Sequence, residues 1–125
     1  MDTIKTKMTS KIAIPILNGF EILNIQEIIR CEADGNYCKI ISPSNHDSNQ
    51  PEIRIVSRNL KEICGNLSKK GFIRIHHSHL INPLYIKKVL KSNGGIIEMV
   101  DGMKIRITQN KETLLHEIFD SVPKI

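Results

Sequence analysis

Apolar and polar residues alternate over several short stretches of the chain, which is the pattern of β-strands that bury one face. The first stretch, Lys11 to Ile16, places Ile12, Ile14 and Ile16 on one face. Because Pro15 has no amide hydrogen to donate, this strand should lie at the edge of a sheet. Further strands are predicted over residues 20–23, 25–32, 37–42, 52–57, 72–75, 85–91, 96–100 and 103–108.

Turn sequences rich in glycine and asparagine separate these stretches and predict that neighbouring strands form antiparallel hairpins. In the strand predicted over residues 52–57, Ile53 and Ile55 are expected to point inward. Residues 43–51 form a polar loop between two prolines. The turn sequences are Asn18-Gly19, Asp34-Gly35-Asn36, Asn93-Gly94-Gly95 and Asp101-Gly102.

Two segments instead carry apolar residues at the spacing of amphipathic helices. The first covers residues 60–67 and follows Ser57-Arg58-Asn59, whose side chains offer acceptors for a helix N-cap. The second covers residues 111–119 and closes the domain. We therefore expect a mainly β fold of small antiparallel sheets with one or two short helices.

The composition agrees with a single β-rich domain. The chain has 125 residues and contains 23 Ile against 9 Leu and 2 Ala, and β-branched isoleucine favours strands. We place the domain at residues 12–120, between a flexible leader at 1–11 and a tail at 121–125. No apolar run is long enough to span a bilayer, and the N-terminus lacks the apolar region of a signal peptide. We expect a cytoplasmic protein whose three cysteines are reduced.

A polar patch at residues 76–79 is the best candidate for catalysis or metal binding. His77 and His79 would share one face of a strand, and Glu32 or Asp34 would have to complete a metal site. No H-E-x-x-H, C-x-x-C or G-x-S-x-G motif accompanies the patch, so we expect no enzyme activity, no metal and no cofactor.

The cysteines show no sign of activation. Cys31 and Cys64 lie in apolar patterns and are predicted to be small core residues, whereas Cys38, between Tyr37 and Lys39, is expected to be more exposed.

The charge balance favours an anionic partner instead. Eighteen Lys and Arg against 13 Asp and Glu give a net charge of +5, which raises the prior for nucleic acid. Aromatic residues make up only 4% of the chain, which disfavours base-stacking platforms and leaves duplex DNA as the better candidate. Cationic and hydrogen-bonding side chains gather near three predicted loops, at residues 36–39, 76–78 and 106–111.

The order of these features resembles the LytTR family of bacterial DNA-binding domains. Residues 28–40 (IIRCEADGNYCKI) resemble the family's first hairpin, and residues 59–63 (NLKEI) its helix. Residues 72–82 (FIRIHHSHLIN) are similar to its F-x-R-I-H-R-S-Y-L-V-N signature. Residues 86–89 and 105–108 match its remaining elements, so the resemblance extends over about residues 12–119 in the family's order.

The resemblance implies an elongated β fold that binds double-stranded DNA as a transcription regulator. Loops would enter successive major grooves, and a homodimer would bind direct repeats, with a receiver domain or another signalling partner supplying control. His77 and Gln109 stand where the family commonly has arginine, so a protein-interaction module that has lost specific DNA binding is the alternative. The DNA contacts that the resemblance implies are Asn36, Tyr37, Cys38, Lys39, His76, His77, Ser78, Thr108, Gln109 and Asn110. The cluster of cationic and polar residues at 106–111 adds Lys111 to them.

Overall fold

Short antiparallel strands dominate the computed structural model, which describes residues 10–44, 50–108 and 110–125. Most of the predicted leader therefore lies outside the described residues. The helices are α2 (Leu60–Leu67) and α3 (Lys111–Ser121). The strands are β1 (Lys11–Ile16), β2 (Gly19–Asn24), β3 (Arg30–Asp34), β4 (Tyr37–Ser42), β5 (Glu52–Val56), β6 (Ile73–His76), β7 (His79–Ile81), β8 (Ile86–Leu90), β9 (Ile96–Met99) and β10 (Lys104–Arg106).

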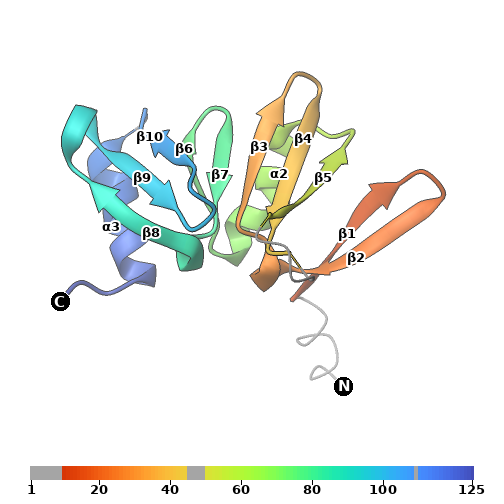
Figure 1. The fold of residues 1–125 in the computed structure, drawn as a ribbon, viewed down its shortest axis with the longest axis horizontal. Helices are drawn as coiled ribbons and strands as arrows, with labels where there is room; N and C mark the ends of the chain where they lie inside the picture. The colour runs from red at the N-terminus through yellow and green to blue at the C-terminus, as the bar shows by residue number, and fades with distance from the viewer. Residues whose placement is uncertain (1–9, 45–49, 109) are drawn as a thin grey trace.

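The strands form three sheets that lie in a row, with the hairpin β1–β2 at one end (Figure 1). The central sheet has the order β5-β4-β3-β7-β6, and the sheet at the other end has the order β10-β9-β8. Every strand pair is antiparallel. The prediction of a mainly β fold of small antiparallel sheets with short helices is confirmed for the described residues.

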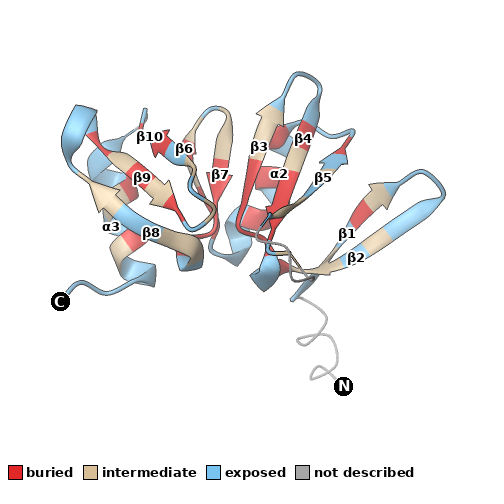
Figure 2. Ribbon diagram, viewed as in Figure 1, coloured by how far each residue is buried: buried red, intermediate tan, exposed pale blue. Residues whose placement is uncertain are grey.

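The central sheet separates two hydrophobic cores, because successive residues of its strands point to opposite faces. One face carries Cys31 and Ile40, which pack against the apolar face of α2 and against Ile14 of β1. The other face carries Ile41 and Ile81, which pack against β9, β10 and α3. Figure 2 shows buried positions in the central sheet and α2 and also in β9, β10 and α3, while the hairpin β1–β2 is more exposed.

Both helices begin and pack as their sequences predict. The Asn59 side-chain oxygen accepts a hydrogen bond from the Glu62 amide at 2.9 Å, which caps α2. All four apolar residues of α2 are buried, and Gly71 ends this region with a φ of +96°. Leu114 and Ile118 of α3 are also buried, so each helix contributes one face to a core.

Two strand predictions are wrong in detail. Ile53 and Ile55 point outward, because β5 pairs with β4 so that Val56 lies opposite Cys38 and Arg54 lies opposite Ile40. Val56 and Arg54 therefore occupy the inner face of the sheet, and the isoleucines occupy the other.

The strand predicted over residues 25–32 begins only at Arg30. Residues Ile25–Glu27 form a 3₁₀ turn, in which the Ile28 amide donates to the Ile25 carbonyl at 3.1 Å.

An ion pair joins the hairpin β1–β2 to the central sheet. The Glu21 carboxylate on β2 accepts two hydrogen bonds from Arg54 of β5, at 2.9 and 3.0 Å. No helix of the described residues is long and apolar enough to cross a membrane.

The outward position of Ile55 on β5 can be tested by comparing its substitution with that of the buried Leu80 on β7. Leu80 has an exposed fraction of 0%, so Leu80→Ala should lower the free energy of unfolding by about 2–5 kcal/mol. Ile55→Ala should lower it by about 1 kcal/mol or less, because Ile55 is already exposed. Urea unfolding of both variants measures the difference, and equal losses would contradict the outward direction of Ile55.

Candidate nucleic-acid interface

The first candidate segment is the tight turn that joins β3 to β4. Gly35 occupies the left-handed region with a φ of +61°, and Asn36 and Tyr37 are exposed beside it. The half-buried Lys39 follows on β4, with its Nζ 3.8 Å from the Asp34 Oδ2. The turn therefore presents an amide, a phenol and an ammonium group at one end of the central sheet.

The second candidate segment is the turn between β6 and β7, which its own side chains hold in place. The Arg74 guanidinium donates to the His77 carbonyl at 2.6 Å, and the Ser78 amide donates to the His76 Nδ1 at 3.0 Å. The rings of His76 and His77 stack with centroids 4.6 Å apart. These contacts leave the His77 side chain exposed at the tip of the turn.

The third candidate segment leads from β10 into α3. Thr108 is exposed, and its amide donates to the Ile75 carbonyl at 3.2 Å. Asn110 has a φ of +26° and its carbonyl accepts the first helical hydrogen bond, from Leu114, at 2.9 Å. Lys111 is the exposed first residue of α3, while the predicted contact Gln109 lies outside the described residues.

Backbone hydrogen bonds bring the three segments to one edge of the molecule. The Ala33 amide of β3 donates to the Ser78 carbonyl at 2.9 Å, which joins the first turn to the second. The bond between Thr108 and Ile75 joins the third segment to the strand that enters the second turn. In Figure 1 the two turns and the end of β10 all lie along the upper edge.

The expectation that Cys38 is exposed is wrong. Its exposed fraction is 0%, because Cys38 lies on the face of β4 that packs against α2, together with Ile40. A side chain in this position cannot reach DNA. The thiols of Cys31 and Cys64 are buried in the same core, and all three cysteines are free.

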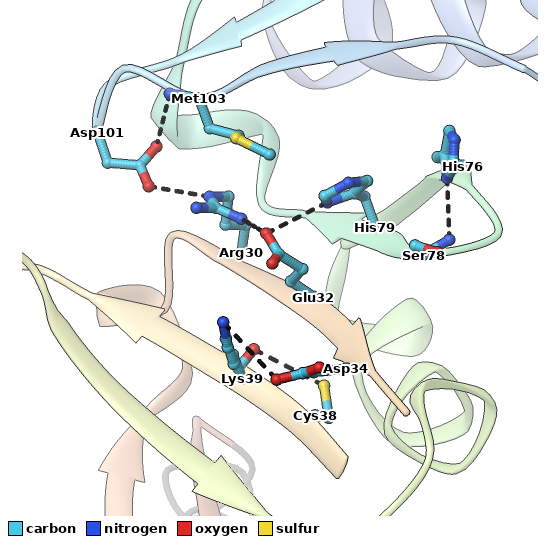
Figure 3. A network of polar contacts seen from close by, with 10 residues as sticks. All are labelled: Arg30, Glu32, Asp34, Cys38, Lys39, His76, Ser78, His79, Asp101 and Met103. Carbon is cyan, nitrogen blue, oxygen red and sulfur yellow. Dashed lines mark hydrogen bonds and ion pairs between the residues drawn. The ribbon is translucent and has the colours of Figure 1, made fainter. Parts of the chain in front are cut away.

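Arg30 is the centre of a largely buried ionic network beneath this edge (Figure 3). Its Nε donates to the Asp101 Oδ2 at 2.9 Å, and its Nη1 donates to the Glu32 Oε1 at 2.8 Å. The side chains of Arg30 and Asp101 are only 10% and 5% exposed. Asp101 belongs to the turn between β9 and β10, so the network fastens the central sheet to the three-stranded sheet.

The network reaches the second turn through His79. The His79 Nδ1 lies 3.9 Å from the Glu32 Oε1 and has no hydrogen-bond partner among the described residues. Burial lowers the pKa of His79, although the Glu32 carboxylate opposes this effect. Burial and the neighbouring His77 also lower the pKa of His76. Both effects favour the neutral form of these imidazoles.

The histidine patch does not form a metal site in the described part of the chain. No group of three His, Cys, Asp or Glu side chains there is arranged to hold a metal ion. The rings of His76 and His79 meet edge to face, with centroids 5.3 Å apart.

The sequence motifs did not identify the residues that support the turns. Arg74 and Arg30 each interrupt an apolar strand, and a charged residue in a buried strand requires a hydrogen-bonding partner. This signal marks both arginines as internal. It does not reveal their partners, which lie at Asp101 for Arg30 and at the His77 carbonyl for Arg74.

The burial of Arg30 gives a prediction for stability. Arg30→Met should lower the free energy of unfolding by about 3–5 kcal/mol, because it leaves the Asp101 carboxylate buried without its cationic partner. Arg58→Met is the matched control, since Arg58 pairs with Glu62 on the surface and such pairs contribute about 0–1 kcal/mol.

A double-mutant cycle separates the ion pair from general packing. Combining Arg30→Met with Asp101→Asn should cost less than the sum of the two single changes, because the second removes the charge that the first leaves unpaired. Urea unfolding of the four proteins measures the coupling. Additive losses would show that Arg30 acts through packing alone.

The lowered pKa values of His76 and His79 predict a dependence of stability on pH. Below about pH 6.5 the unfolded chain takes up protons on these imidazoles more readily than the folded chain, because the pKa values are lowered in the folded state. The free energy of unfolding should therefore fall as the pH is lowered from about 7 to 5.5.

Substitution of His79 tests whether this histidine contributes to the pH dependence of stability. His79→Gln should reduce the slope of stability against pH relative to the wild-type chain, because it removes one of the two imidazoles whose pKa is lowered in the folded protein. Urea unfolding at several pH values gives both slopes, and an unaltered slope in His79→Gln would contradict the role of His79.

Comparison with known proteins agrees with this architecture. A similar solved structure is described as the LytTr DNA-binding domain of a putative methyl-accepting/DNA response regulator from Bacillus cereus. It has 17% sequence identity and a TM-score of 0.67, and the match covers 88% of this chain and 96% of that one, which shows a shared fold. A comparison with curated proteins found no match. The family model described as the LytTr DNA-binding domain matches residues 18–120, and the chain therefore belongs to the LytTR family.

Proposed function

We propose that this chain binds double-stranded DNA at specific sequences and regulates transcription, without enzymatic activity. Membership of a DNA-binding domain family supports the proposal. The observation that carries it is the alignment of three segments along one edge, through the bonds from Ala33 to Ser78 and from Thr108 to Ile75. A row of loops on one edge suits a long duplex better than a small substrate, and binding would occur where the chromosome lies, in the cytoplasm.

The side chains along this edge divide into two roles. Asn36, His77 and Asn110 can donate to and accept from base edges in the major groove. Lys39 and Lys111 can neutralise phosphates. The proposed DNA surface also includes Tyr37, His76, Ser78 and Thr108. Gln109 is proposed as a contact from the sequence alone. Cys38 is removed from it, because its side chain is buried.

We propose further that two copies bind adjacent direct repeats and that the loops of each copy enter successive major grooves. A receiver domain or another signalling partner would then control the occupancy of the site. The spacing of bound half-sites tests the first part, because copies on one face of the duplex require about one helical turn, or 10–10.5 bp, between repeats.

A second candidate is a module that binds another protein. The hairpin β1–β2 favours it, because its apolar residues Ile16, Leu17, Phe20 and Ile22 are exposed, Leu17 to 96%. This candidate predicts no selected DNA sequence and an interface at the hairpin, far from the edge that carries the loops.

Selection from random duplexes, followed by affinity measurements at two salt concentrations, tests the proposal. A selected motif should emerge, and log affinity should fall with log salt by about 0.9 for each neutralised phosphate. Salt-dependent binding without a selected motif would leave a non-specific DNA-binding protein, and the absence of any binding would leave the protein-interaction candidate.

Three variants test the division of roles at the edge. Asn110→Ala and His77→Ala should weaken the selected site by about 1–3 kcal/mol and flatten preference among sites. Lys39→Ala should weaken all sites alike and reduce the salt slope by about 1. Fluorescence anisotropy with labelled duplexes measures these effects, and identical behaviour of the three variants would contradict the division.

Lys70→Ala is the control for charge. Lys70 precedes β6, and β6 ends at His76 in the second turn, so Lys70 lies at the opposite end of the strand from the proposed surface. Its loss should leave the affinity and the salt slope unchanged.

A further inference from the structure

A groove lies between the end of β8 and the helix α3, and of its lining residues only Lys111 is a proposed DNA contact. Its volume is about 590 Å³, within the range of about 300–1,000 Å³ for pockets that bind small molecules. The residues that line it are Val89, Leu90, Lys91, Gly95, Lys111, Glu112, Leu115, His116, Phe119 and Lys124.

The groove has an apolar floor because α3 carries more apolar residues than the core covers. Leu114 and Ile118 enter the core, whereas Leu115 and Phe119 are one helical turn apart on a neighbouring face and remain only half-buried. They meet the half-buried Val89 of β8 across the groove. An apolar ligand segment placed here would cover surface that otherwise contacts water.

The rim of the groove is cationic. Lys91, Lys111 and Lys124 line it, and among the described residues no carboxylate lies within ion-pair distance of any of them. Lys124 instead lies 5.2 Å from the centre of the Phe119 ring. Glu112 is the single carboxylate among the lining residues, so the rim favours an anionic group on a bound ligand.

Lys111 connects the groove to the proposed DNA surface. A Cβ added at Gly95 would lie 3.3 Å from the Lys111 Cε, which shows that the lysine stem passes closely over this glycine at the groove. The same lysine follows Asn110 at the start of α3. An anion bound at the rim and a DNA phosphate would therefore compete for one ammonium group.

We propose that this groove binds a small amphipathic carboxylate, with its apolar part on Leu115 and Phe119 and its carboxylate beside Lys91 and Lys111. Binding of such a molecule weakens DNA binding, and DNA weakens its binding by the same factor. The effect on DNA binding rests on the proposed function, whereas the binding of the carboxylate in the groove does not.

Titration of the ¹⁵N-labelled chain with decanoate tests the site without DNA. Amide shifts should concentrate at residues 89–91, 95 and 111–119. Decanol, which has the same tail without the charge, should bind at least about tenfold more weakly. Shifts elsewhere, or equal affinity for decanol, would overturn the proposal.

Two nearby lysines provide a matched pair of variants, because Lys88 lies on β8 and Lys91 directly follows the last residue of that strand. Lys91→Glu should weaken decanoate binding by about tenfold or more, because it reverses one charge at the rim. Lys88→Glu makes the same change at an exposed position of β8 outside the lining and should leave the affinity unchanged. Equal effects of the two variants would indicate general charge attraction and overturn the site.

Competition with a selected duplex tests the link to DNA. Decanoate should lower the affinity of the wild-type chain for the duplex and should have little effect on Lys91→Glu. If decanoate binds the groove and leaves DNA affinity unchanged, the regulatory part is wrong. If no duplex is bound at all, the proposed function fails, while the titration still decides whether the groove binds the carboxylate.

Discussion

The buried guanidinium of Arg30 is the constraint on which the arrangement of the sheets depends. A charge with so little contact with water needs anionic partners, and Arg30 takes one from Glu32 on its own strand and one from Asp101 on the β9–β10 turn. The bond to Asp101 joins the central sheet to the three-stranded sheet, while the bond to Glu32, within β3, orients the guanidinium. Hydrophobic packing between the sheets is less directional, so the ion pairs fix what the packing leaves adjustable.

The same constraint extends to the edge that carries the proposed DNA contacts. Glu32 holds Arg30 and also lies beside His79, the first residue after the second turn. Arg74 supports that turn from the preceding strand. The turn is therefore supported on both sides by side chains that do not reach the edge themselves, which suits a surface whose spacing must match that of a duplex.

Local sequence patterns predicted most of the elements, because turn residues, helix caps and periodicity act over a few neighbouring residues. They did not predict which face of an edge strand is buried. The alternation of β5 is compatible with either face, and pairing with β4 decided that Ile53 and Ile55 point outward. The burial of Cys38, in contrast, was predictable from the sequence. Cys38 and Ile40 are two residues apart on β4 and therefore share a face, and Ile40 is buried.

The candidate site was predictable as a set of segments but not as a surface. The motifs located the three loops along the chain, while their common edge depends on backbone bonds between distant residues such as Ala33 and Ser78. The groove beside α3 was likewise hidden, since a helical pattern does not show how much of an apolar face its neighbours cover.

The position of β3 in the central sheet also has a consequence for the route of folding. β3 pairs with β4 through a short turn, but it pairs with β7 only after residues 32 and 79 have come together. Closing so long a loop has an entropic cost that a hairpin avoids, and contacts distant in sequence slow folding. We therefore expect the pairing of β3 with β7 to form later in folding than the hairpins on either side of it.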